Sequence, residues 1–164
     1  MALSRDLLRH ARQLATRRGR PSQINLRRAT SAAYYALFHL LIGEVVERMV
    51  PTDPPELRVR AARSIQHGDM KQACVDIGNP PKKLQSLLGA GTSPELRAIA
   101  KSFIDLQEER HAADYNVALR LSQSAVLNSV AKAEAAFAHW ELVRVSAEAN
   151  IFLAAIVFGA RWNR

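Results

Sequence analysis

A single arginine, Arg110, occupies a position where the sequence predicts an apolar side chain. Alternating steps of three and four residues, the spacing of one face of a helix, connect an apolar series that leads directly to this arginine. The series consists of Leu96, Ile99, Phe103 and Leu106, and its next positions are Arg110, Ala113 and Val117. Because a guanidinium stays charged and is costly to bury alone, Arg110 is expected to meet a carboxylate, a bound phosphate group or water in a cleft.

The neighbours of Arg110 leave two interpretations open. Asp114 lies four residues further on and can form an ion pair with Arg110 within the helix, a structural contact of small energetic value if it is exposed. Glu108, Glu109 and His111 crowd the same turn. Charges concentrated on an otherwise apolar stripe favour a functional site instead.

A second line of polar residues lies on the segment 22–50, which is apolar around most of its circumference between Ala29 and Val46. Such a helix is surrounded by neighbouring helices or by a partner chain, so it should be the central element. Steps of three and four residues place one set of polar side chains along a single edge of it. This edge consists of Arg28, Ser31, Tyr35 and His39, with Tyr34 and Phe38 beside it. The edge forms either one wall of a ligand cleft or a set of ordinary buried groups with hydrogen-bond partners.

Helical periodicity covers almost the whole chain, and no segment reads as a strand. The expected helices are 4–18 with Ser4 as its cap, 22–50 opened by Ser22, 56–75, 93–115 opened by Ser93, and 117–158. The last of these is one helix or two joined by a bend near Asn150, and one helical turn is expected at 82–88 within the irregular stretch 76–94. The fold class is therefore all-α, in a single domain of residues 1–164.

The positive charge is concentrated near the beginning of the sequence. The formal net charge is +8, and residues 1–28 contain eight arginines against one acidic residue, Asp6, so the other 136 residues carry a net charge of only +1. A local basic surface of this kind can attract phosphate backbones without sequence preference. It can equally be a solvated helix face or a docking surface for an acidic partner.

Cysteine content, apolar runs and motifs restrict the cellular setting and the chemistry. The only cysteine, Cys74, cannot form an internal disulfide, and no signal peptide opens the sequence, so a cytoplasmic location is expected. The longest apolar run, 151–160, has about half the length that a membrane-spanning helix needs, so we expect no membrane association. The sequence contains no HExxH or CxxC motif, phosphate-binding loop or nucleophile elbow, and we expect neither a metal site nor a cofactor.

Two segments of the chain resemble the HEPN family of helical domains, many of which bind nucleotides or cut RNA. The segment Arg28 to His39 (RATSAAYYALFH) is similar to the second-helix pattern of the family. Arg110, Asp114 and Tyr115 resemble the "Arg, three residues, Asp, Tyr" pattern of one bacterial branch. Residues similar to the intervening helix of that branch are Ala62, Arg63, His67, Met70 and Lys71. The resemblance covers roughly residues 23–135.

The resemblance implies a fold, a ligand and partners. The fold is an antiparallel bundle of four to five helices, usually a homodimer in which the arginine-bearing helices of two subunits face each other across a shared cleft. The ligand is a nucleotide or RNA, with Arg110 on a phosphate group and Tyr35 and Tyr115 on a base or sugar. The residues expected to bind it are Arg28, Ser31, Tyr34, Tyr35, Arg110 and Tyr115. The expected protein partner is a small nucleotidyltransferase, the antitoxin of a bacterial toxin–antitoxin or defence pair.

Catalysis depends on a residue that active HEPN ribonucleases usually carry and this chain lacks. In those enzymes four to six residues separate the arginine from a histidine. The corresponding positions here are Tyr115, Asn116 and Val117. Metal-independent RNA cleavage needs a base for the ribose 2′-hydroxyl, an acid for the leaving oxygen and a cation at phosphorus. Tyrosine, with a reference pKa of about 10, is a poor base near neutral pH.

Other residues would have to replace the missing histidine. Arg110 could supply the cation, and His111, His39 or Asp114 could transfer protons. The candidate catalytic residues are therefore Arg110, His111, Asp114, Tyr115 and His39. Whether the protein is an enzyme stays open. The alternative function is a non-enzymatic helical interaction module in which the same polar groups fix a dimer.

Overall fold

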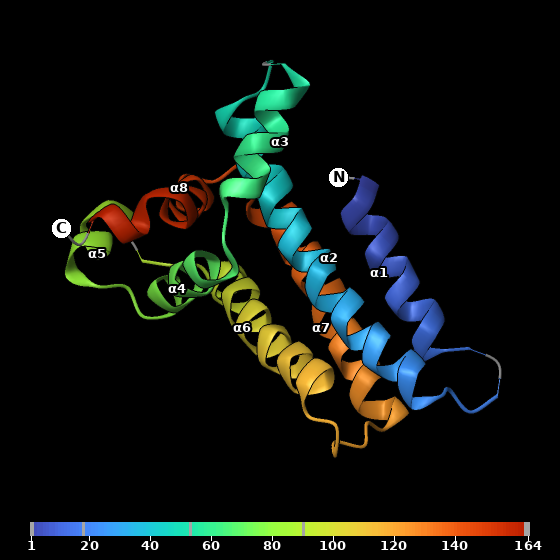
Figure 1. Ribbon diagram of the computed structural model, residues 1–164. Helices are drawn as coiled ribbons and strands as arrows, with labels where there is room; N and C mark the ends of the chain where they lie inside the picture. The colour runs from blue at the N-terminus through green and yellow to red at the C-terminus, as the bar shows by residue number, and fades with distance from the viewer. Residues whose placement is uncertain (1, 18, 53, 90, 163–164) are drawn as a thin grey trace. The chain divides into compact units, whose positions relative to one another are not determined.

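The structure is a computed structural model that describes residues 2–17, 19–52, 54–89 and 91–162 (Figure 1). Over these residues it contains eight helices and no strand, which confirms the predicted all-α class but gives more helices than the expected four or five. The helices are α1 (Ala2–Ala15), α2 (Gln23–Met49), α3 (Pro55–Ser64), α4 (His67–Gly78), α5 (Lys82–Leu88), α6 (Pro94–Tyr115), α7 (Gln123–Val143) and α8 (Ala147–Trp162).

The chain divides into two compact units, whose boundaries fall inside α2, α6 and α7. Unit 1 comprises the described residues of Met1–Leu40 and Ser102–Ala138. Unit 2 comprises the described residues of Leu41–Lys101 and His139–Arg164. The polar residues singled out on the segments 28–39 and 108–115 all belong to unit 1.

Unit 1 consists of α1 together with the parts of α2, α6 and α7 that belong to it, lying side by side (Figure 1). Successive segments run in opposite directions, so α1 and α6 point one way and α2 and α7 the other (Figure 1). Alanines on α1, α2 and α7 are buried without remaining exposure, which lets these helices approach closely. They are Ala11, Ala15, Ala29, Ala33, Ala36, Ala133 and Ala136. Larger buried side chains, among them Tyr34 and Phe103, fill the remaining space.

Serine side chains define several helix starts. The Ser22 hydroxyl accepts a hydrogen bond from the backbone N–H of Asn25 (3.3 Å), and the Ser93 hydroxyl accepts one from Leu96 (3.2 Å), so both predicted starts are confirmed. The prediction for Ser4 is wrong, because α1 begins at Ala2 and buries Ser4 within it. This helix ends at Ala15, before the predicted end at Arg18, which lies outside the described residues.

The predicted helix 56–75 is in fact two helices. Ile65 and Gln66 separate α3 from α4 with extended backbone angles, φ −81° and ψ 119° at Ile65 and φ −98° and ψ 150° at Gln66. Ile65 is buried, whereas α3 buries none of its own residues. The break therefore places the side chain of Ile65 in the core, although the helix before it contributes no buried residue. The short helix predicted at 82–88 is confirmed as α5.

The predicted helix 117–158 is also interrupted, and it begins later than expected. The Ser122 hydroxyl accepts a hydrogen bond from the N–H of Ala125 (3.1 Å) and so caps α7, which leaves 116–122 as a connection. Val117, predicted to continue the apolar stripe, lies in this connection and is exposed. The interruption itself falls at 144–146 rather than near Asn150. The Ser146 hydroxyl accepts a hydrogen bond from the N–H of Ala149 (3.1 Å) and so caps the start of α8.

In unit 2, α4 and α5 both pack against α8. The largest side chains buried here without exposure include Trp140, Phe152, Met70 and Ile77. Cys74 is a free cysteine in this core, and its burial raises the pKa of the thiol strongly. It is therefore an inert packing residue, since thiol reactivity depends on the thiolate.

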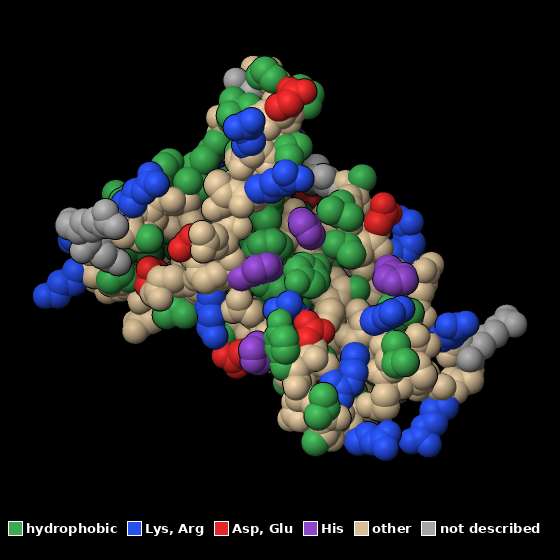
Figure 2. All heavy atoms as spheres, in the orientation of Figure 1, with side chains coloured by type: hydrophobic (Ala, Val, Ile, Leu, Met, Phe, Trp, Pro, Cys, Tyr) green, Lys and Arg blue, Asp and Glu red, His purple; other side chains and the backbone are tan. Residues whose placement is uncertain are grey.

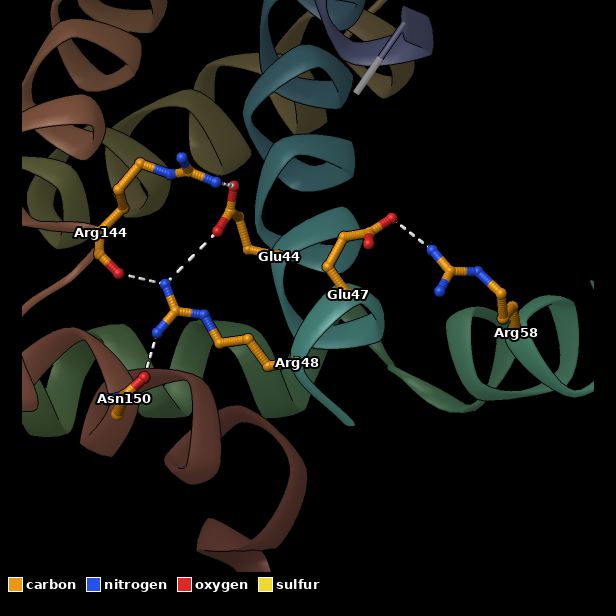
Figure 3. A network of polar contacts seen from close by, with 6 residues as sticks. All are labelled: Glu44, Glu47, Arg48, Arg58, Arg144 and Asn150. Atoms are coloured by element: carbon orange, nitrogen blue, oxygen red, sulfur yellow. Dashed lines mark hydrogen bonds and ion pairs between the residues drawn. The ribbon is translucent and has the colours of Figure 1, made fainter. Parts of the chain in front are cut away.

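A buried carboxylate joins α2 to the connection between α7 and α8 within unit 2 (Figure 3). Glu44 is only 3% exposed, and its carboxylate accepts from Arg144 (3.0 Å) and lies 3.4 Å from Arg48. Arg48 also donates to the side chain of Asn150 and to the backbone carbonyl of Arg144. The two arginines thereby hold the break between α7 and α8 against α2.

Helix α2 is long and apolar enough, by length and composition, to cross a membrane. Its most apolar stretch has a mean hydropathy of 1.3, and 78% of that stretch is buried inside the protein. The core helix of a globular protein passes the same test, so this property is weak evidence for a membrane span.

Candidate functional site

The predicted polar edge of α2 is confirmed by the burial pattern of this helix. Arg28 is exposed, and Ser31, Tyr35 and His39 are half-buried, whereas the positions between them from 29 to 38 are buried. Tyr34, which was expected to bind a ligand, retains no exposed surface and lies in the core. The edge is therefore the only part of α2 between residues 28 and 39 that is open to solvent in the described structure.

Arg110 points into unit 1, as the apolar stripe predicts. Its side chain is 21% exposed, and its Nε lies 2.7 Å from a carboxylate oxygen of Asp114. One Nη donates a hydrogen bond to the hydroxyl of Tyr35 (3.0 Å). Of the three partners expected for this guanidinium, the structure shows the carboxylate, and the closest of its aromatic partners comes from the polar edge of α2.

Three tyrosine rings frame the guanidinium. Its central carbon lies 5.9 Å from the ring centroid of Tyr34, 5.4 Å from that of Tyr35 and 5.9 Å from that of Tyr115. These distances fall within the range of cation–π attraction. Tyr34 is in turn backed by the buried ring of Phe103, with centroids 5.4 Å apart. Tyr115, by contrast, is 64% exposed and leaves its ring accessible to a ligand.

A second contact between α2 and α6 completes the arrangement. The Ser31 hydroxyl donates a hydrogen bond to Asp114 (2.6 Å), so Ser31 and Tyr35, four residues apart on α2, face Asp114 and Arg110, four residues apart on α6. We refer to the six side chains of this arrangement as the Arg110 cluster. They are Ser31, Tyr34, Tyr35, Arg110, Asp114 and Tyr115.

A cavity of about 440 Å³ opens beside the Arg110 cluster. Its lining consists of Ile24, Arg27, Arg28, Ala113, Asp114 and Val117. Asp114 belongs to both the cluster and the cavity lining, so the cavity adjoins the ion pair of Asp114 with Arg110, although Arg110 itself does not line it. Arg28 is exposed and contributes a second guanidinium to the cavity lining.

Sequence reasoning missed the role of Arg27. Its guanidinium donates to the backbone carbonyls of Ala113, Asn116 (3.0 Å) and Leu119 (2.7 Å), and so it holds the end of α6 and the connection that follows. The last carbonyls of a helix need partners, which is a general signal, but nothing in the sequence indicates that this particular arginine supplies them.

The two histidines proposed for proton transfer lie at the margin of the cluster. His111 is exposed, and its ring centroid is 4.8 Å from that of Tyr115. His39 lies beside Tyr35 (6.3 Å) and Phe38 (5.5 Å). None of the contacts given by the described residues joins either histidine to Arg110. The arrangement thus fixes the position of a cation beside an accessible aromatic ring, but it does not bring a histidine acid or base into contact with that cation.

Potential metal ligands do not gather in the described part of the chain, where no group of three or more His, Cys, Asp or Glu side chains could hold an ion. Glu109, which crowds the turn of Arg110 in sequence, points elsewhere. Its carboxylate accepts from Ser129 (2.6 Å) and pairs with Lys132, both on α7. Glu109 is therefore a structural link between α6 and α7.

His39 predicts a specific dependence of stability on pH. Partial burial lowers the pKa of His39 below its ordinary value of 6.5, so the folded chain binds fewer protons than the unfolded chain at pH values between the lowered pKa and 6.5. The contribution of His39 to the free energy of unfolding should therefore be fully present above pH 6.5 and should decrease as the pH falls toward the lowered pKa. We expect His39→Gln to lose less stability than the wild type between about pH 7.5 and about pH 5 in urea unfolding.

The matched control for this prediction is His10→Gln, which replaces an exposed histidine in the same unit. The difference in pH dependence between His39→Gln and the wild type gives the contribution of His39, and the same difference for His10→Gln gives the background effect of removing an exposed histidine. Identical pH dependence of unfolding in His39→Gln and the wild type would contradict the assignment.

Comparisons with known proteins add no relative. A scan against protein-family models, a search of curated proteins and a search of solved structures each found no match to this chain. The resemblance to HEPN domains therefore rests on the sequence motifs, and the function has to be inferred from the chemistry of the Arg110 cluster.

Proposed function

We propose that this chain is a HEPN-like protein that binds a phosphate group of a nucleotide or RNA at the Arg110 cluster. The observation that carries the proposal is a largely buried guanidinium that is framed by three tyrosine rings and lies beside a cavity lined by two further arginines. Arginine suits this task because its planar fork of donors matches phosphate oxygens and its face stacks on aromatic rings.

The geometry suggests how a ligand would be held. A phosphate group that displaced Asp114 from Arg110 would lie at the edge of the cavity, whose lining includes the exposed Arg28. The exposed ring of Tyr115 would stack on the base, a contact worth about 1–3 kcal/mol per base in proteins that bind single strands. Tyr35 would keep Arg110 oriented through its hydroxyl.

The wider proposal follows from the sequence resemblance. The helices of unit 1 would form the HEPN-like antiparallel bundle, and two copies of the chain would pair so that their Arg110 clusters share one cleft. The protein would act in the cytoplasm as the ribonuclease-type toxin of a toxin–antitoxin or defence pair, with a small nucleotidyltransferase as its partner. If it cleaves RNA, His111, His39 or Asp114 would transfer the protons. Because neither histidine contacts Arg110, the cluster supports binding more directly than cleavage.

One observation favours a second function, a non-enzymatic interaction module. Arg110 is already paired with Asp114, and Asp114 already accepts from Ser31, so these side chains hold one another without a ligand. In this alternative the cluster would fix the relative register of α2 and α6 and, through them, a dimer. A protein of this kind would show no affinity for nucleotides or RNA.

Replacing Arg110 separates the two functions. We expect Arg110→Ala to bind a fluorescein-labelled, 5′-phosphorylated uridine dinucleotide about tenfold to a hundredfold more weakly than the wild type, the usual cost of a lost charged hydrogen bond. Fluorescence anisotropy measures the affinity. Arg97→Ala is the matched control, since Arg97 is an exposed arginine on the same helix but in unit 2.

Two outcomes would contradict binding at the Arg110 cluster. One is equal affinity of Arg110→Ala and the wild type for the dinucleotide. The other is an equal loss in Arg97→Ala, which would show that total charge rather than this site determines binding. Circular dichroism and thermal unfolding of each variant establish that it is folded.

A further inference from the structure

One end of unit 1 carries arginines that the Arg110 cluster does not use. At this end lie the connection between α1 and α2 and the connection 116–122 between α6 and α7 (Figure 1). The two connections are tied together, because Gln123 donates to the carbonyl of Ala15 (2.8 Å) and Gln23 exchanges hydrogen bonds with the backbone of Leu121 (2.8 and 3.0 Å). Arg17 and Arg20 on the first connection and Arg120 on the second are exposed. We call these three arginines the basic end.

Acidic residues do not compensate the charge of the basic end. The segments 16–22 and 116–122 contain no aspartate or glutamate. None of the three arginines forms an ion pair with another described residue, whereas two arginines within α1 do. Arg9 pairs with Asp6 (3.2 Å) and Arg12 with Glu134 (2.5 Å). Figure 2 shows Lys and Arg side chains gathered over this part of unit 1.

The basic end continues from the cavity beside the Arg110 cluster. Arg27 lines this cavity and also holds the connection 116–122 through the carbonyls of Asn116 and Leu119, so Arg120 follows directly on a segment that is attached to the cavity wall. Arg28, in the cavity lining, is exposed as well. A chain of phosphate groups that began at the cluster would therefore meet further arginines as it left the cavity in this direction.

We infer that the basic end binds the phosphate backbone of a single-stranded RNA that extends from the Arg110 cluster, so that the ligand is an oligoribonucleotide rather than a free nucleotide. This inference rests on the proposed function of the cluster. A single-stranded RNA carries cations condensed along its phosphate groups, and binding gains free energy when exposed arginines release them, whatever the RNA sequence. RNA is favoured over an acidic polypeptide because the accessible ring of Tyr115 offers a surface on which a base can stack.

The test compares a long and a short probe. The variant Arg17→Ala/Arg20→Ala/Arg120→Ala removes the basic end, and its three positions are exposed, so folding should be unaffected. The long probe is an oligouridylate of about 16 nucleotides, a length that single-strand binding surfaces can accommodate. The short probe is the 5′-phosphorylated uridine dinucleotide. The control variant Arg60→Ala/Arg63→Ala/Arg97→Ala removes the same charge from exposed positions in unit 2.

We expect the affinity of the triple variant of the basic end to depend less strongly on salt concentration than that of the wild type, and only with the long probe. The slope of log affinity against log salt concentration should become shallower by about 2, because each lost phosphate contact on a single strand contributes about 0.7. At about 50 mM salt the affinity for the oligouridylate should fall by about tenfold or more. Affinity for the dinucleotide should match that of the wild type, and the control variant should behave like the wild type with both probes.

Several results would overturn the inference. They are a wild-type slope in the variant of the basic end, an equal change in the control variant, and a polyglutamate of similar length that competes as well as the oligouridylate. The last result would identify an acidic polypeptide as the ligand. Failure of the proposed function is distinguishable, since it appears as wild-type binding of the dinucleotide by Arg110→Ala.

Discussion

Replacing Phe103 by alanine is expected to lower the free energy of unfolding by about 3–5 kcal/mol, the usual cost of removing a fully buried aromatic ring. Phe103 has no exposed surface, and its ring centroid lies 5.4 Å from that of Tyr34 and 6.5 Å from that of Phe38. The substitution would leave a void behind Tyr34, on which the guanidinium of Arg110 rests. Urea unfolding followed by circular dichroism measures the loss.

A conservative variant at the same position separates packing from other effects. Phe103→Leu retains most of the buried volume and should cost less than about 1.5 kcal/mol. In binding experiments, Phe103→Ala should also lower the affinity for the dinucleotide more than Phe103→Leu does, because the wall of the Arg110 cluster would be less rigid. A loss below about 1 kcal/mol in Phe103→Ala would contradict the structure, since a surface position typically loses no more than that.

Replacing Glu44 by glutamine is expected to lower the free energy of unfolding by about 2–3 kcal/mol. The carboxylate of Glu44 is buried and is shared by Arg48 and Arg144 (Figure 3). A neutral amide would leave two nearby guanidinium groups without a counter-charge. The loss should stay below the full cost of an isolated buried charge, because both arginines are partly exposed and water can reach them.

Glu47 provides the control on the same helix. It pairs with Arg58, as Figure 3 also shows, but its side chain is 57% exposed. Exposed ion pairs contribute about 0–1 kcal/mol, so Glu47→Gln should have an effect in that range. Unfolding in urea compares both variants under one condition. Equal losses in Glu44→Gln and Glu47→Gln would show that burial of the carboxylate does not determine its contribution.

The parts of the fold that follow from helical periodicity could be predicted from the sequence. The apolar stripe of α6 is buried from Leu96 to Leu106 and at Ala113, with Arg110 turned inward between them. The polar edge of α2 is open to solvent at every position expected of it. Both patterns depend on the local spacing of residues, which a sequence displays directly.

The breaks in the helices could be predicted only in part. Ser122 and Ser146 are N-cap residues, and because serine is a preferred N-cap, the sequence does contain a signal for the starts of α7 and α8. The separation of α3 from α4 at Ile65 has no such signal. It depends on which core buries this side chain, and burial of this kind is decided by packing between distant segments rather than by local propensity.

The candidate site shows the same division. The pairing of Arg110 with Asp114 is local, since four residues on a helix bring two side chains together, and it is one of the two interpretations that the sequence leaves open for Arg110. The contacts of Tyr35 with Arg110 and of Ser31 with Asp114 join residues 75 and 83 positions apart. They require one particular register of α2 against α6, which the sequence does not display. The exposed arginines of the basic end are local features whose common location appears only in three dimensions.

The most direct test of the central claim observes the Arg110 side chain while a ligand binds. Two-dimensional ¹H–¹⁵N spectra of the arginine Nε–H groups, assigned with Arg110→Lys and Arg97→Lys, would be recorded during titration with the 5′-phosphorylated uridine dinucleotide. We predict that the Arg110 resonance shifts in a saturable manner as the phosphate takes the place of Asp114, while that of Arg97 stays unchanged. Saturable binding that leaves the Arg110 resonance unmoved would contradict phosphate recognition by this guanidinium.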